Sequence, residues 1–147
     1  MKTTGMGPTT VAGSQVCLNA SWENVVTATA TVESLHAQWV DAFNSHDLDR
    51  HMELYTEDAC LFGSVDELQV GRDAIRAYFG RRPPGMRVKS YPMPLVRQAT
   101  ADVALTAGHV DFANGDELSP YRMTWALVRR GGNWRIAQHH GSPRRGG

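Results

Sequence analysis

The stretch "YRMTWALVRRGGNWRIAQHH", Tyr121–His140, decides the fold class, because it contains two strand-like segments joined by a short turn. Bulky apolar residues alternate with smaller or polar residues on both sides of Arg130–Asn133, which is typical of half-buried strands. The two glycines between the segments predict the turn. We therefore expect an antiparallel hairpin that completes a sheet near the end of the chain.

The same alternation predicts which side chains of the hairpin face the core. In the first strand the bulkier set is expected on the concave face: Tyr121, Met123, Trp125 and Leu127. In the second strand the pattern places Trp134 and Ile136 inside and leaves His140 near the mouth of the concave side. A β-bulge in this strand would turn His139 inward in place of His140.

Two more strand-like segments precede the hairpin, over residues 86–99 and 102–113. Pro92 and Pro94 interrupt the first, so we expect an edge or bulged strand there. The second has two possible inward faces, and the sequence leaves both open. One face carries a polar pair at its end: Val103, Leu105, Ala107, His109 and Asp111. The other is apolar throughout: Ala104, Thr106, Gly108, Val110 and Phe112.

Helices are expected before these strands. Apolar residues recur every three or four positions from Thr31 to Phe43, which predicts an amphipathic helix. Asp47 is a candidate N-cap for a second helix whose apolar face is Leu48, Met52 and Tyr55. A short strand follows at residues 58–64, and a third helix is expected over residues 73–80. Three helices on one face of a curved, mostly antiparallel sheet make an α+β fold.

Composition limits the possible functions. The 147 residues are enough for one domain with a single core, with 41% hydrophobic residues. Fifteen basic and fifteen acidic side chains give no net charge, which argues against a nucleic-acid partner. Cys17 and Cys60 lack the spacing of a disulfide or metal framework and are expected as free thiols. No signal peptide or membrane span is expected, so the sequence favours a soluble, cytoplasmic protein.

The chain is expected to have three parts. Residues 1–28 are rich in small polar residues and predict a flexible N-terminal arm. Residues 29–143 form the folded domain, and residues 144–147 form a tail that contains Arg144 and Arg145.

Several segments in this order resemble a known family. They are the helix "WVDAFNSHDLD", then "YTEDA", then "GRDAIRAYF", and finally the hairpin "WALVRRGGNWRIAQHH". Together they resemble the SnoaL-like branch of the nuclear transport factor 2-like superfamily, over about residues 30–142. More narrowly, the chain is similar to the small cavity proteins encoded in enediyne polyketide antibiotic clusters.

The resemblance implies a cone-shaped α+β fold in which a curved sheet wraps around three helices and encloses a pocket, usually in a homodimer. Catalytic relatives include ketosteroid isomerase, scytalone dehydratase and polyketide cyclases, whereas other members only bind or assemble. Because one fold supports these different activities, the site has to be argued from its residues.

The candidates for acid–base chemistry are His109, Asp111, His139 and His140. At most one of the two adjacent histidines can face a pocket, and His140 is the one assigned to this role with His109 and Asp111. His109 and Asp111 are two residues apart on one strand, so they share a face, where a carboxylate could orient an imidazole. The alternative is a solvated polar pair at a strand end. No metal is expected: His46 and His51 are poorly spaced on a helix, and His109 with Asp111 supplies too few ligands for zinc. No cofactor is expected either.

A set of large side chains is expected to line an apolar pocket, and flat rings suit a conjugated ligand. The set is Trp39, Tyr55, Phe62, Tyr78, Phe79, Tyr121, Met123, Trp125 and His139. Three functions remain open. The protein binds an apolar polyene or polyketide intermediate beside a polyketide synthase, or it is a cyclase, isomerase or dehydratase, or it is a structural dimerisation module.

Overall fold

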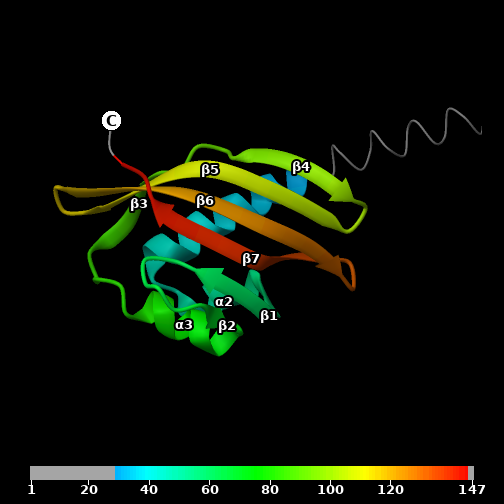
Figure 1. Ribbon diagram of the computed structural model, residues 1–147, viewed down its shortest axis with the longest axis horizontal. Coiled ribbons are helices and arrows are strands. Elements are labelled where there is room, and N and C mark those ends of the chain that lie inside the picture. The colour runs from blue at the N-terminus through cyan, green and yellow to red at the C-terminus, as the bar shows by residue number, and fades with distance from the viewer. Residues whose placement is uncertain (1–28, 146–147) are drawn as a thin grey trace, which may run out of the picture.

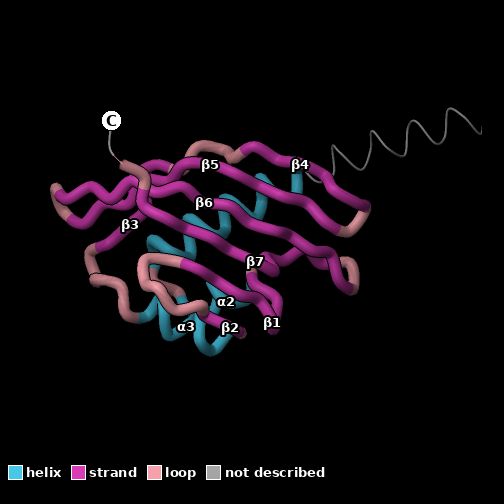
Figure 2. Tube along the Cα trace, in the orientation of Figure 1, coloured by secondary structure: helices cyan, strands magenta, loops and turns pink. Residues whose placement is uncertain are grey.

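The computed structural model describes residues 29–145, and it contains a curved sheet with helices against its concave face (Figure 1). A long helix covers residues 29–45 and lies across the back of the central strands (Figure 2). Two shorter helices, α2 (Leu48–Glu53) and α3 (Arg72–Gly80), lie near the edge of the sheet. The expected arm, residues 1–28, lies outside the described residues, as does Cys17.

The sheet has seven strands, in the order β2-β1-β7-β6-β5-β3, with β4 also paired to β5. Their bounds are β1 Tyr55–Phe62, β2 Gln69–Val70, β3 Met86–Ser90, β4 Leu95–Thr100, β5 Val103–Asn114, β6 Glu117–Arg130 and β7 Asn133–Pro143. The only parallel pairing among these strands joins β1 to β7. This pairing brings the first strand beside the last one. The expected α+β fold with a curved, mostly antiparallel sheet is confirmed.

The long helix forms because its apolar residues share one face. Val32, Leu35, Trp39 and Phe43 are all buried, at the spacing that predicted the helix. The expected cap of α2 is also present, since the carboxylate of Asp47 accepts a hydrogen bond from Arg50 N at 3.1 Å.

Tyr55 was expected on the helical face of α2, but it is the first residue of β1. The helix closes one residue earlier, where Leu54 N donates to His51 O at 3.2 Å. The carbonyl of Leu54 then accepts a hydrogen bond from Ile136 N at 2.7 Å. Pairing with β7 therefore overrides the helical period at Tyr55.

The segment 86–99 forms two strands rather than one. β3 and β4 both pair with β5, but Pro92 and Pro94 lie between them and lack the backbone N–H that a ladder requires. The connection between β3 and β4 passes close to Gly108 of β5. A Cβ atom there would lie 3.0 Å from Pro94 Cβ and 3.5 Å from Tyr91 Cε1, so glycine favours this close approach.

The burial pattern of β5 and β6 shows which faces of these two strands turn inward. Met123, Trp125 and Leu127 are buried in β6, which confirms the predicted face. In β5 the buried residues are Ala104, Thr106, Val110 and Ala113, so the second of the two open alternatives is the observed one along most of the strand. His109 consequently faces the convex side of the sheet and is exposed.

The last strand contains a bulge that reverses its inward face. Leu127 pairs with Ile136, whereas the next residue back, Ala126, pairs with Gln138, so Ala137 is an extra residue. Ile136 is buried as predicted, but beyond the bulge His139 is buried and His140 is exposed. The prediction that His140 faces the concave side is therefore wrong, and the bulge alternative is correct.

Within residues 29–145, no helix is long and apolar enough to cross a membrane.

Candidate functional site

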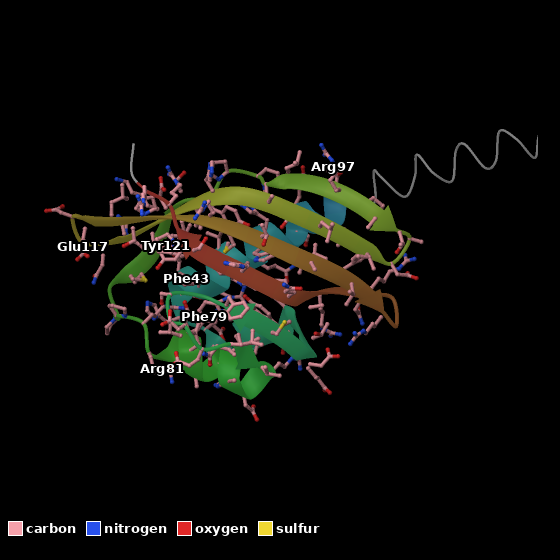
Figure 3. All side chains as sticks on the ribbon, in the orientation of Figure 1. Phe43, Phe79, Arg81, Arg97, Glu117 and Tyr121 are labelled. Atoms are coloured by element: carbon pink, nitrogen blue, oxygen red, sulfur yellow. The ribbon has the colours of Figure 1, made fainter. Side chains whose placement is uncertain are left out.

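A cavity of about 260 Å³ opens at one end of the concave side. Figure 3 shows Phe43, Phe79 and Tyr121 gathered at this end, with Arg81 further out near the end of α3. The lining residues come from both helical and strand elements: Trp39, Phe43, Gly63, Ser64, Val65, Tyr78, Phe79, Arg81, Arg82, Pro83, Met86, Phe112, Ser119, Tyr121, Met123, His139 and Gly141.

Aromatic rings form a continuous wall of this cavity. The ring of Phe43 lies 5.3 Å from that of Trp39 and 5.1 Å from that of Phe112. The ring of Phe112 meets that of Tyr121 edge to face at 5.5 Å. These centroid distances are within the range of favourable aromatic pairs, so the wall is packed and preformed. Met86 and Met123 add two flexible apolar side chains.

A chain of hydrogen bonds leads from the core to the cavity. Trp39 Nε1 donates to Tyr55 Oη at 2.9 Å, and Tyr55 Oη lies 2.8 Å from His139 Nδ1. The three side chains are buried, and the rings of Tyr55 and His139 are nearly parallel at 6°. The bulge at Ala137 is what turns His139 toward these partners.

Burial determines the protonation states of Tyr55 and His139 in this series of hydrogen bonds. It lowers the pKa of His139 to about 3, with a smaller contribution from the charge of His140. Burial also raises the pKa of Tyr55 well above its ordinary value. Both side chains are therefore uncharged at neutral pH, and they present hydrogen-bonding groups rather than charges.

Hydroxyl groups and two arginines lie at the cavity mouth. Ser64 N donates to Tyr78 Oη at 2.9 Å, and the Ser64 hydroxyl lies 3.2 Å from the same oxygen. The guanidinium of Arg82 stacks 3.8 Å above the ring of Phe43 and donates from Nη2 to Phe43 O at 2.5 Å. Burial lowers the pKa of Arg82. None of the lining residues carries a carboxylate, so the charge at this mouth is positive.

A second buried histidine, His51, lies behind the cavity wall. It is fully buried, and its ring centroid is 4.4 Å from that of Phe79. Neither ring nitrogen of His51 has a hydrogen-bond partner among the described residues. Burial lowers its pKa to about 3, and the charges of Arg82 and His139 act in the same direction.

Six of the side chains predicted to line the pocket do so: Trp39, Tyr78, Phe79, Tyr121, Met123 and His139. The other three lie elsewhere. Tyr55 and Trp125 are buried in the core without lining the cavity, and Phe62 is exposed beside His140, with ring centroids 5.9 Å apart.

The three residues predicted for acid–base chemistry lie outside the cavity. His109 is exposed and pairs across the ladder with Arg122, so it does not contact the cavity. Asp111 is held by Arg144, whose Nη2 lies 2.7 Å from Asp111 Oδ1. The alternation of β5 and the bulge in β7 are the physical reasons, because they direct these side chains to the other face.

Arg144 was expected in a tail, but it is tied to the sheet by Asp111 and by its own N–H, which donates to Pro120 O at 3.0 Å.

Several lining residues were not predicted. Phe112 could have been found, because it belongs to the apolar alternative for β5. Phe43 was predicted on the buried helix face but was not assigned to the pocket. Arg82 gave no signal, since the loop "RRPPG" has no periodicity.

Comparison with known proteins agrees with this architecture. The family model described as "SnoaL-like domain" matches residues 32–145. No match was found among curated proteins.

Three solved structures illustrate the likeness of fold. A nuclear transport factor 2-like protein with a cystatin-like fold from Novosphingobium aromaticivorans has a TM-score of 0.74 and 17% identity, over 87% of this chain and 89% of that chain. A ketosteroid isomerase-like protein from Erwinia carotovora atroseptica has a TM-score of 0.69 and 22% identity, over 78% and 94% of the two chains. A putative calcium/calmodulin dependent protein kinase II association domain from Xanthomonas campestris has a TM-score of 0.65 and 25% identity, over 77% and 85%.

The names of these structures include both an isomerase-like protein and an association domain, so the shared fold does not determine a function. The family, however, follows from the match over residues 32–145 together with the curved sheet, the helices on its concave face and the cavity that they enclose. The chain belongs to the family of SnoaL-like domains.

Proposed function

We propose that this protein binds an apolar, conjugated small molecule in the cavity, as an accessory protein of polyketide antibiotic biosynthesis, of the enediyne type. The observation that carries the proposal is the cavity itself, with its continuous aromatic wall and no lining carboxylate. The polyketide context comes from the sequence resemblance, and a polyketide synthase is the proposed partner that delivers the ligand.

The size of the cavity supports a ligand larger than a single ring. An engineered apolar protein cavity of about 150 Å³ is enough to bind benzene. The cavity here has about 260 Å³ and is open to solvent at one end. It therefore suits a two-ring body, or a short conjugated segment whose remainder extends through the mouth.

Binding is better supported than catalysis. A cofactor-independent cyclase, isomerase or dehydratase needs a group in the cavity that accepts and returns a proton near neutral pH. His139 is the only imidazole among the lining residues, and its pKa of about 3 makes it a weak base. The predicted partners His109, Asp111 and His140 do not line the cavity. The cavity is open rather than filled by side chains, and this also favours binding over a purely structural role.

A homodimer is part of the proposal, with the convex face of the sheet as its interface. One row of cross-strand neighbours on this face is Leu95, Ala107, Thr124, His140 and Phe62, and all five are exposed. Leu105 and Val70 lie in the adjacent row. Large apolar side chains that share one exposed face are typical of a surface that another copy covers.

Calorimetric titration with methyl naphthyl ketone, an apolar conjugated two-ring probe, tests the binding proposal. The control is Gly141→Leu, because a Cβ at Gly141 meets only ordinary contacts, 3.7 Å from His139 Nε2 and 3.8 Å from Tyr121 Cδ2. The longer leucine side chain is expected to occupy the cavity. We expect saturable binding by the native protein and at least tenfold weaker binding by Gly141→Leu. Equal affinities would show that the probe binds elsewhere and would contradict the proposal.

A further inference from the structure

Hydrogen positions in the Trp39–Tyr55–His139 chain follow from its donors and acceptors. The indole of Trp39 can only donate, so the Tyr55 oxygen accepts that bond at 2.9 Å. The Tyr55 hydroxyl has one hydrogen of its own, and the only other partner that the described residues offer is His139 Nδ1 at 2.8 Å. A buried hydroxyl hydrogen without an acceptor costs about 1–3 kcal/mol.

The opposite arrangement would leave that cost in place. If His139 Nδ1 carried the hydrogen, the Tyr55 oxygen would accept twice, and its own hydrogen would have no acceptor among residues 29–145. Tyr55 therefore donates to Nδ1. Since the imidazole of His139 is neutral, its single hydrogen is on Nε2.

The second ring nitrogen of His139 lies on the cavity side. Gly141 and Tyr121 both line the cavity, and Nε2 is 3.7 Å from the position of a Cβ on Gly141. Nε2 has no hydrogen-bond partner among the described residues. Unlike the unpaired nitrogens of His51, it is not completely buried, so it is accessible from the cavity. A neutral N–H donor is thus presented to a cavity whose lining is largely apolar.

We propose that the ligand of this cavity carries a carbonyl oxygen, which accepts a hydrogen bond from His139 Nε2–H, and that Tyr55 and Trp39 act as positioning residues that fix this donor. The inference rests on the proposed binding function and names the chemical class of the ligand: a conjugated ketone, aldehyde or ester rather than a hydrocarbon. A site built to donate one hydrogen bond discriminates against an analogue that lacks the acceptor, because the donor is then left unpaired.

A matched pair of probes tests this ligand class. Methyl naphthyl ketone and isopropenylnaphthalene have the same shape, with C=O in one replaced by C=CH₂ in the other. We expect the native protein to bind both and to bind the ketone about tenfold more tightly, as one hydrogen bond of about 1.4 kcal/mol provides. His139→Phe should remove this preference, and His140→Phe, on the opposite face, should retain it.

Binding of both probes with equal affinity by the native protein would overturn the carbonyl inference while leaving the apolar binding function intact. If the native protein bound neither probe, the result would instead count against the proposed function, so the two failures are distinguishable. Retention of the ketone preference in His139→Phe would also overturn the inference.

A spectroscopic readout tests the positioning role without any ligand. In ¹⁵N NMR spectra of the native protein at neutral pH, we expect His139 with a protonated Nε2 and an unprotonated Nδ1. Tyr55→Phe removes the hydroxyl that donates to Nδ1, so the signals of His139 should move toward a mixture of tautomers. A native spectrum with hydrogen on Nδ1 would contradict the assignment, as would a Tyr55→Phe spectrum identical to the native one.

Discussion

At the scale of single residues, His51 is the least satisfied side chain near the cavity. It is fully buried among Trp39, Phe43 and Phe79, and both of its nitrogens lack partners within the described residues. A buried polar group without hydrogen bonds destabilises the folded state by about 1–3 kcal/mol.

We predict that His51→Leu raises the free energy of unfolding at neutral pH, by about 1 kcal/mol, because the unpaired nitrogens are removed from an apolar site. Urea denaturation of the native and variant proteins measures this difference. A loss of stability would show that His51 makes an interaction that its surroundings do not reveal.

The two buried histidines also predict how stability depends on pH. Burial lowers the folded-state pKa of both His51 and His139 from 6.5 to about 3, so the unfolded chain binds more protons between these values. The contribution of these two neutral rings to the free energy of unfolding has its full value above pH 6.5, and it decreases as the pH falls toward 3. Each histidine contributes about 1.4 kcal/mol per pH unit in that window.

Urea denaturation between pH 7 and pH 4 measures this slope. His51→Leu should reduce it by about 1.4 kcal/mol per pH unit, since one of the two histidines no longer takes up a proton on unfolding. An unchanged slope in the variant would mean that His51 is already protonated in the folded protein.

At the scale of elements, the cavity mouth depends on a close contact between the end of β1 and α3. A Cβ at Gly63 would overlap the hydroxyl and Cζ of Tyr78, whose oxygen accepts the hydrogen bond from Ser64 N. We predict that Gly63→Ala displaces the Tyr78 ring and lowers the free energy of unfolding by about 1 kcal/mol.

A double-mutant cycle with Tyr78→Ala measures this contact. In the Tyr78→Ala background, Gly63→Ala should cost almost nothing, because the overlapping ring is absent. The matched control is Gly80→Ala, within α3, where a Cβ meets only Leu48 Cδ1 at 3.6 Å and alanine favours the helix. Additive effects of Gly63→Ala and Tyr78→Ala would contradict the contact.

The elements also show which features the sequence could predict. The long helix, the cap at Asp47 and the inward face of β6 were predictable, because each depends on a regular period or a local hydrogen bond. The inward face of β7 beyond Ala137 was not, since a single extra residue reverses the alternation and leaves no mark in the composition. Tyr55 fits a helical period but pairs with Ile136, more than eighty residues away, which local sequence does not encode.

The same limits apply to the candidate site. Aromatic residues on predicted inward faces, such as Phe79 and Tyr121, do line the cavity. The predicted acid–base group depended on His109, Asp111 and His140, whose faces were set by strand pairing and by the bulge. The hydrogen-bonded chain through Trp39, Tyr55 and His139 joins three separate elements, and only the fold brings them together.

At the scale of the whole molecule, the convex face of the sheet is the proposed dimer interface. We predict that Leu105→Asp, at an exposed position of this face, converts a dimer into a monomer, because the interface would then bury an unpaired carboxylate. The control is Leu118→Asp, which changes a similarly exposed leucine near the tip of the β5–β6 hairpin, beside Glu117 (Figure 3). Sedimentation velocity measures the mass of each variant. A monomeric native protein, or equal masses for both variants, would contradict this interface.

The central claim is that the cavity receives an apolar conjugated ligand, and a crystal structure of the protein grown with methyl naphthyl ketone tests it most directly. We predict density for the two rings between Phe43, Phe79 and Tyr121, with the ketone oxygen within hydrogen-bond distance of His139 Nε2. A cavity filled by the protein's own side chains, with the ketone absent from it at saturating concentration, would contradict the account.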